Sequence, residues 1–522
     1  MNNTTQPGAS PTGPAATNNA PAVKSVLRMG VFTLAMINVS AIVSLRGMPA
    51  ESTYGLSSVF YYIFAAVFFL VPVSLVAAEL TTGWPQKGGV YRWVGEAFGK
   101  KWGFLAIWLQ WIESTIWFPT VLTFAAVSLA FMGPGQRWDE ALAANKWYVL
   151  IVVLCVYWAA TLLNLRGMET SAGVTKWGTI IGTIIPGAIL ILLGLSYWAG
   201  GNPILLDMSW DKLVPDMSNF NNLVLAASIF LFYAGMEMSA VHVKDVNNPG
   251  RNYPLAILIS AIITVLIFVL GTLAIGFIIP NSQINLVQSL LITYDSYFSF
   301  FGLGWMNWIL ALALAVGVLA QVTAWVGGPS KGLYQVGLAG NLPPVMQKRN
   351  KNNVQMGILL IQGGIVTLLS IMFVIMPSVQ SAYQIISQLT IILYLIMYML
   401  MFASGIYLRY REPNTPRTFR IPGGRTFGMW VVGGLGLLAS LAAFLVSFIP
   451  PNQITVGSST MYVLLLVVGT FIFAGIPFII HAMAKPSWKR PVDPEDAFEP
   501  FGWEKNNGSH SAATPSHSIS HE

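Results

Sequence analysis

A carboxylate interrupts an apolar stretch of the chain between residues 226 and 254. The first half of this stretch, AASIFLFYAGME, is apolar enough to enter a lipid bilayer, yet it carries Gly235 and Glu237. A carboxylate at membrane depth is costly and by default faces a substrate or ion pathway, and a neighbouring glycine lets the helix unwind where it lines a cavity. The alternative is a plain span whose glycine serves close helix packing and whose carboxylate pairs with a neighbouring helix.

A second apolar stretch, near the N-terminus, is interrupted in a comparable way. It reads AMINVSAIVSLRGMP and places Asn38, Ser40, Ser44, Arg46 and Gly47 where hydrocarbon is expected. Interrupted helices in corresponding positions of two halves indicate a transporter built as an inverted repeat. In such a pair a half-helix N-terminus offers unpaired N–H groups to an anion, and unwound carbonyl groups accept from a cation. The two halves share no visible identity, so this symmetry is predicted from position alone.

The composition places both stretches in a membrane protein. The chain of 522 residues is 55% hydrophobic and 9% charged, against about 25% charged residues in soluble domains. The formal net charge of +7 does not indicate nucleic-acid binding, because the basic residues lie in short loops where they set membrane orientation. The single cysteine, Cys155, permits neither a disulfide framework nor a metal cluster, and neither a metal nor another cofactor is predicted.

Apolar runs of spanning length follow one another along most of the chain. About twelve are predicted, with ends uncertain by roughly four residues. They lie near residues 30–48, 57–81, 103–130, 147–165, 173–199, 220–241, 254–279, 304–327, 355–376, 382–408, 427–449 and 461–483. We therefore expect an all-α polytopic membrane protein, in which a 5+5 inverted repeat contains broken helices 1 and 6 and two peripheral helices follow.

The basic residues predict the orientation of the spans. One set of alternate loops carries most of them, whereas the other set holds little beyond Arg137, Lys146 and Lys212. Since basic loops remain cytoplasmic, both termini are predicted inside, with the chain in a bacterial plasma membrane. Residues 1–24 form a predicted disordered N-terminus, and residues 25–484 form the transmembrane domain.

Residues 485–522 are predicted to be a cytoplasmic tail of low complexity. It carries His510, His517 and His521. The simplest interpretation is a solvated, disordered segment. The sharper hypothesis is a plug over the cytoplasmic mouth that leaves as pH changes, because histidine titrates near physiological pH.

Several segments carry a resemblance to a known family. The run YAGMEMSAVHVKDVNNPGRNYPLAI resembles the sixth helix of the amino acid–polyamine–organocation superfamily, and within it the bacterial glutamate/GABA antiporters. The segments AAELTTGWPQKGGVYRWVGEAFGKKWGF, IIPNSQINL, GVLAQVTAWVGGPSKGLY, RTFRIPGGR and AFLVSFIPPNQI are similar to the same family, in the same order. The resemblance covers roughly residues 25–485 and implies an amino acid held near the midplane between the two broken helices.

The resemblance assigns backbone groups to this substrate. It implies that N–H groups of the first broken helix bind the α-carboxylate and that carbonyl groups of the sixth, beside Gly235, bind the α-ammonium. The implied donors belong to Ile42, Val43 and Ser44, and the implied acceptors belong to Leu231 and Ala234.

Gating roles carry over from the resemblance one residue at a time. Glu237 matches a carboxylate that relays between the site and the cytoplasmic gate, and Trp325 matches an aromatic gate over the substrate. Tyr394 and Tyr398 match a tyrosine pair, and their i, i+4 spacing places both hydroxyls on one helix face. Lys176 lies where some proton-coupled relatives carry a lysine. The alternatives are a structural ion pair for Glu237, packing for the aromatic residues and a snorkelling side chain for Lys176.

The chain also departs from the family pattern at three positions. Gln321 stands where the antiporters have a glutamate, Glu113 stands where they have a neutral residue, and Arg46 stands where they have an aromatic and an acidic residue. A guanidinium can clamp a carboxylate with two hydrogen bonds, which favours an acidic substrate. The alternative places Arg46 on the extracellular lip, away from substrate.

These observations favour an amino-acid antiporter that exchanges glutamate, or a similar small amino acid, for GABA or a related product by alternating access. A proton-coupled amino-acid symporter with Lys176 or Glu237 as the proton carrier is the first alternative. An ion channel or a membrane-embedded enzyme is more remote, and the sequence contains no P-loop, HExxH or GxSxG motif. Small amino acids and the lipid bilayer are thus the expected partners, and the oligomeric state is left open.

Overall fold

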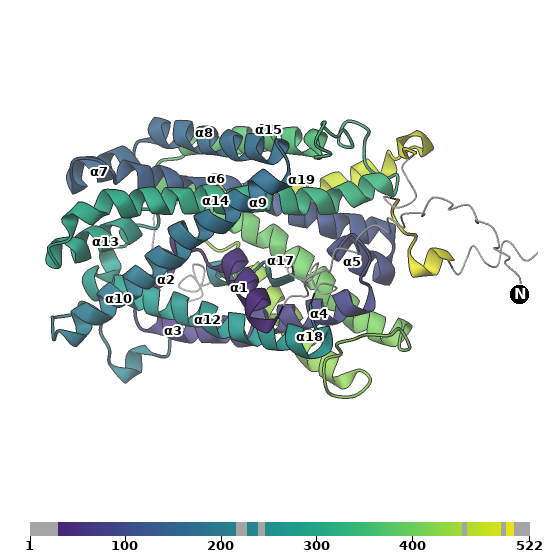
Figure 1. Cartoon of the computed structure of the whole chain (residues 1–522), viewed down its shortest axis with the longest axis horizontal. Coiled ribbons are helices and arrows are strands. Elements are labelled where there is room, and N and C mark those ends of the chain that lie inside the picture. The colour runs from purple at the N-terminus through teal and green to yellow at the C-terminus, as the bar shows by residue number, and fades with distance from the viewer. Residues whose placement is uncertain (1–29, 216–226, 238–245, 452–456, 492–496, 506–522) are drawn as a thin grey trace, which may run out of the picture.

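The computed structural model describes residues 30–215, 227–237, 246–451, 457–491 and 497–505. Every regular element in these ranges is a helix (Figure 1). Ten helical segments are long and apolar enough to cross a membrane: Ser57–Gly83, Lys100–Ala130, Lys146–Leu165, Gly173–Ala199, Gly250–Ile278, Gly304–Leu338, Met356–Ile375, Val379–Arg411, Phe427–Val446 and Ser459–Ala482. The predicted all-α polytopic class is confirmed.

Two further stretches in the described residues contain helix breaks and correspond to the first and sixth of the predicted spans. The first consists of α1 (Val31–Ile42), the short turn η1 (Leu45–Gly47) and α2 (Met48–Ser52). The sixth begins with α11 (Ser228–Tyr233), after which Ala234 is extended. Gly235 follows with a φ of 111°, a conformation open mainly to glycine. Both predicted interruptions therefore occur.

The helix packing agrees with a repeat of five spans. Helix α1 packs on α12 (Pro249–Ile278), and the equivalent pair five spans away, α11 and α3 (Ser57–Ala65), also packs together. Likewise, α6 (Lys100–Ala130) packs on α17 (Val379–Arg411), and α14 (Asn307–Leu338) packs on α9 (Met168–Thr179). Figure 1 shows α6 and α14 side by side through the centre of the molecule.

The remaining long elements complete this bundle. Helix α4 (Val71–Gly83) continues α3, α10 (Ile185–Ala199) continues α9, and α16 (Met372–Ile375) follows α15 (Met356–Ser370). Helix α8 (Lys146–Leu165) packs on α6 and α14. The last two spans, α18 (Phe427–Val446) and α19 (Ser459–Ala482), pack on the outside of α17, which is the peripheral position expected for them.

The largest difference from the predicted boundaries is in one span, which is longer than predicted. Three connections between spans also contain short helices that were not predicted. Helix α14 continues to Leu338, eleven residues past the predicted end at 327. Pro329 removes one helical hydrogen bond there, but close packing against α6 keeps the segment helical. The connections hold short helices that their polar sequences did not predict, namely α5 (Val90–Phe98), α7 (Gln136–Ala143) and α13 (Ser289–Phe300).

The loops of opposite predicted sidedness lie at opposite ends of the molecule. Helices α7 and α13 lie at one end, whereas α5 and the C-terminal segment lie at the other (Figure 1). The described part of this C-terminal segment is residues 497–505. In it, the N–H of Gly502 donates to both carboxylate oxygens of Glu96 on α5, at 3.1 and 2.9 Å, and Phe501 is buried. The three histidines of the predicted plug and residues 1–24 lie outside the described residues, so both remain predictions.

A buried ionic cluster joins α4 to α17 and to the loop that follows it. Both oxygens of Glu79 accept from Arg409, at 2.5 and 2.6 Å, and one accepts from Arg417 at 3.0 Å. The backbone N–H of Ile421 also donates to Oε2 of Glu79, at 2.8 Å. Glu79 is 1% exposed and Arg409 is fully buried, so each charge depends on its partners for compensation.

Removing Glu79 is therefore expected to destabilise the fold. Glu79→Ala leaves two buried guanidinium groups uncompensated, at a cost of about 3–5 kcal/mol. Thermal unfolding of the purified protein in detergent measures this loss. Glu499→Ala, which removes only the exposed ion pair with Lys505, serves as the control and should leave the midpoint unchanged. Equal midpoints for the two variants would contradict the structural role of Glu79.

Candidate functional site

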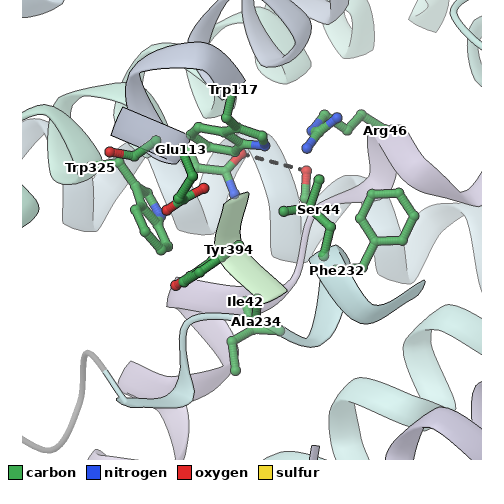
Figure 2. A pocket seen from close by; sticks show the side chains of 12 residues that line it. Ile42, Ser44, Arg46, Glu113, Trp117, Phe232, Ala234, Trp325 and Tyr394 are labelled. Atoms are coloured by element: carbon green, nitrogen blue, oxygen red, sulfur yellow. Dashed lines mark hydrogen bonds between the residues drawn. The ribbon is translucent and has the colours of Figure 1, made fainter. Parts of the chain in front are cut away.

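One buried pocket lies between the two helix breaks. Nine of the predicted site residues line it, from five different spans (Figure 2). The lining consists of Ile42, Ser44, Arg46, Glu113, Ser114, Trp117, Leu231, Phe232, Ala234, Gln321, Trp325 and Tyr394. The cavity measures about 30 Å³, which is room for little more than one water molecule. The structure thus describes the site in a contracted form.

The first break presents fewer donors than predicted. The N–H of Val43 donates to the carbonyl oxygen of Val39 at 2.8 Å, because the hydrogen bonding of α1 continues past Ile42. Val43 is extended and buried, but it does not line the pocket. The expectation that its N–H is unpaired is therefore wrong for this conformation. Ser44 does line the pocket, and its hydroxyl donates to Gln321 Oε1 at 3.5 Å (Figure 2).

The sixth-helix break interrupts the helical hydrogen bonding of two residues that line the pocket. The carbonyl oxygen of Leu231 accepts from the N–H of Ala234 at 3.2 Å and retains a second lone pair. Ala234 is extended, so its carbonyl leaves the helical ladder. Both residues line the pocket, where these oxygens can accept from an ammonium group.

Glu237 lies behind the pocket and is held by three side chains. Tyr394 and Tyr398 each donate to one carboxylate oxygen at 2.6 Å, and Gln110 donates at 3.0 Å. The N–H of Gly235 donates to the hydroxyl of Tyr398 at 2.9 Å. The predicted tyrosine pair thus shares one face of α17. Since Tyr394 also lines the pocket, its hydrogen bond connects Glu237 to the pocket wall.

Glu113 brings a second carboxyl to the site. Its side chain is 2% exposed and lines the pocket, and among the described residues its Oε1 has no hydrogen-bond partner. A buried acceptor without a partner is costly, so an ammonium group in the pocket would stabilise Glu113.

Arg46 brings a cation to the opposite wall. Its Nη1 donates to the hydroxyl of Tyr383 at 2.9 Å, and its guanidinium lies 5.3 Å from the centre of the Trp117 ring and 5.6 Å from that of Phe232. Arg46 is 3% exposed, and its Nε has no partner among the described residues. It therefore lies within the protein and not on an exposed lip. A carboxylate reaching this wall would meet a desolvated guanidinium.

Trp325 covers the second helix break. A Cβ atom added to Gly235 would lie 3.2 Å from the Trp325 ring, so only glycine fits this contact comfortably. The ring also packs against Trp117 with their centres 5.7 Å apart. The two indoles form part of the pocket wall, and the gating role of Trp325 stays a prediction.

One predicted residue lies elsewhere. Lys176 on α9 is exposed, with its ammonium group 5.4 Å from the ring of Trp177, and it does not line the pocket. The snorkelling alternative agrees with this placement, because the ammonium group lies at the exposed surface beside an aromatic ring.

Sequence reasoning missed five residues that build the site. They are Ser114 and Trp117 in the lining, Phe232 in the lining, Tyr383 on Arg46, and Gln110 on Glu237. A signal existed for two of them, because Gln110 and Trp117 fall three and four residues from Glu113 and so share its helix face. The other three carry no distinctive pattern.

A helical membrane protein whose two broken helices enclose a buried polar pocket has the architecture of a secondary transporter. The chain belongs to the amino acid permease family, whose model matches residues 29–473. It is 40% identical to an uncharacterized transporter of Legionella pneumophila, over 86% of this chain and 96% of the relative. It is 32% identical to a glutamate/gamma-aminobutyrate antiporter of Lactococcus lactis, over 87% of this chain and 90% of the relative.

A more distant relative has a different named substrate. It is a probable agmatine/putrescine antiporter of Lactococcus lactis, 24% identical over 71% of this chain and 77% of the relative. The family and these names identify this chain as a membrane transporter of amino acids or related amines.

Proposed function

We propose that the protein is an antiporter that exchanges glutamate, or a similar small amino acid, for GABA or a related product by alternating access. The observation that supports this most is the single pocket lined by nine of the predicted substrate and gating residues. The named antiporter among the relatives supports the same pair of substrates. We place the chain in the plasma membrane with both termini in the cytoplasm, on the basis of its basic loops.

A guanidinium on one wall and a carboxyl on the other suit an exchanger of this kind. Arg46 offers a guanidinium to the side-chain carboxylate of glutamate. Glu113 offers an unpartnered oxygen to the ammonium group that both substrates carry. The carbonyl groups of Leu231 and Ala234 then serve the ammonium as a second set of acceptors. The α-carboxylate binds at the first break beside Ser44.

Substrate must widen the pocket before it can bind. The present cavity is about 30 Å³, whereas an amino acid needs several times this volume. Trp325 and Trp117 contact each other across the pocket wall, so their separation would open it. Because Trp325 also contacts Gly235, movement of the indole is linked to the sixth-helix break.

A proton-coupled symporter is the second candidate. Tyr394 lines the pocket and its hydroxyl donates a hydrogen bond to Glu237. This connection favours the symporter, because Glu237 could exchange a proton in step with substrate binding. Lys176 contributes nothing to this candidate from its exposed position.

Counterflow in proteoliposomes tests the proposal. Vesicles loaded with unlabelled amino acids and GABA, in separate batches, are diluted into radiolabelled glutamate. Exchange predicts rapid uptake only with an internal substrate. Uptake into empty vesicles that follows an imposed pH gradient would instead support symport, and no uptake with any internal amino acid or amine would contradict both.

A further inference from the structure

A further buried carboxyl lies outside the pocket, on the half of the first broken helix that follows the break. Glu51 on α2 is fully buried and does not line the pocket. Its Oε1 accepts a hydrogen bond from the hydroxyl of Ser228, the first residue of α11. Its Oε2 has no hydrogen-bond partner among the described residues. This one bond therefore joins the second half of broken helix 1 to the first half of broken helix 6.

The described surroundings supply no cation to Glu51. The titratable groups on α11 and on the elements that pack most against α2 and α11 are Arg46, Tyr61, Tyr62, Tyr233, Arg251, Tyr253, Tyr294, Asp295 and Tyr297, together with Tyr383, Tyr394, Tyr398, Tyr407, Arg409, Tyr410 and Arg411 of α17. Of the two arginines on α17, Arg409 is bound by Glu79 and Arg411 donates to the carbonyl of Ala97. Arg46 is bound by Tyr383, and Arg251 lies at the far end of α12. The nearest phenols are engaged elsewhere, since Tyr233 donates to the carbonyl of Tyr62 at 3.2 Å and Tyr62 shares a hydrogen bond with Thr272 at 3.0 Å.

An ionised carboxylate is costly in this place. Burial of a charge is tolerated when it is paired and fully hydrogen-bonded, and within the described part of the chain Glu51 has one hydrogen bond and no ion pair. The neutral acid avoids most of this cost. Separation of α2 from α11 would bring water to the same group and so allow it to ionise.

We propose that Glu51 is a proton-binding site that controls the separation of α2 from α11. The closed contact binds the proton more tightly than the separated form. Acid therefore favours closure, and loss of the proton as pH rises favours opening. This inference rests on the alternating-access function proposed above, in which these two half-helices part on the predicted extracellular side.

Thiol labelling of purified protein in detergent tests the site without any substrate. In a Cys155→Ser background, Ser52→Cys places a nearly isosteric reporter beside Glu51, at a position that is 1% exposed. Asp207→Cys, on the exposed loop before η4 (Trp210–Lys212), calibrates the reactivity of an accessible thiol at each pH. The ratio of the two maleimide rates between pH 5 and 8 then reports the opening of α2.

The ratio is expected to rise with pH, by at most about tenfold per pH unit because one proton is released. Glu51→Gln, which keeps the acceptor for Ser228 but cannot ionise, should reduce the change to less than about twofold over the same range. Ser228→Ala should retain the pH dependence and raise the ratio about two- to tenfold at each pH, because the closed form loses one hydrogen bond.

Two results would overturn the proposal. One is a ratio that does not change with pH in the protein with Glu51 intact, and the other is an unchanged pH dependence in Glu51→Gln. Should Glu51→Gln fail to fold, Glu51→Asp decides, because it keeps an ionisable group and must keep the pH dependence. Failed counterflow with intact pH-dependent labelling would reject the proposed exchange and leave the proton site standing.

Discussion

Glu237→Gln should slow exchange by about 100-fold or more while the protein still folds. The carboxylate accepts from Tyr394, Tyr398 and Gln110, and an amide can accept through only one of its two terminal atoms. The hydroxyl of Tyr398 already accepts a hydrogen bond from the N–H of Gly235. If the NH₂ group of the glutamine introduced at position 237 faced this hydroxyl, the hydroxyl proton would have no acceptor. Losing charge-assisted bonds of about 1.5–3 kcal/mol each accounts for a factor of this size.

Counterflow rates and elution profiles measure this effect together. Tyr398→Phe is the matched variant, because it removes one bond to Glu237 and the bond to Gly235 but keeps the charge. It should be slowed less than Glu237→Gln. A folded Glu237→Gln protein with the parent rate of exchange would remove Glu237 from the transport pathway.

Arg46→Ala should weaken binding of acidic amino acids by about tenfold or more relative to neutral ones. Arg46 lines the pocket and is 3% exposed. A guanidinium binds a carboxylate through charge-assisted hydrogen bonds, which are stronger than neutral ones. A neutral amino acid has no second carboxylate to lose. The half-saturating concentrations of glutamate and of a neutral substrate, measured in the same proteoliposomes, give the ratio.

Two controls distinguish the effect of the positive charge of Arg46 from the effects of its bidentate geometry and of its contact with Tyr383. Arg46→Lys keeps the charge but not the two-pronged geometry, so it should recover only part of the discrimination. Tyr383→Phe removes the neighbour that occupies Nη1 and should leave the preference for acidic substrates in place. An equal loss for neutral and acidic substrates in Arg46→Ala would argue for a purely structural role.

The sequence predicted the architecture well because hydrocarbon imposes simple rules. Apolar length predicted about twelve spans, of which ten are long apolar helices in the described residues. Polar residues within apolar runs indicated the two breaks, near Ser44 and Gly235. The end of α14 was misplaced because Gly327, Gly328 and Pro329 read as a helix terminus. Contacts with α6 decide that segment, and such contacts are not encoded locally.

The site was predicted in part, for a related reason. Glu237 and Glu113 stand out because charge is rare at membrane depth. Tyr383 and Phe232 become site residues only when α17 and α11 approach Arg46. Glu51 was missed because MPAESTYG reads as a polar loop after the first span. The fold buries it completely, since the half-helix after the break packs against α12 and α13.

The contracted cavity has a consequence for measured affinity. A protein that spends most of its time with this space shut binds ligand only through the rarer wide form. The apparent dissociation constant is then the intrinsic one divided by the fraction of molecules in that form. Relaxing the contact between Trp325 and Trp117 would enlarge this fraction, so a smaller side chain at either indole should tighten equilibrium binding even as it slows the return step that turnover requires.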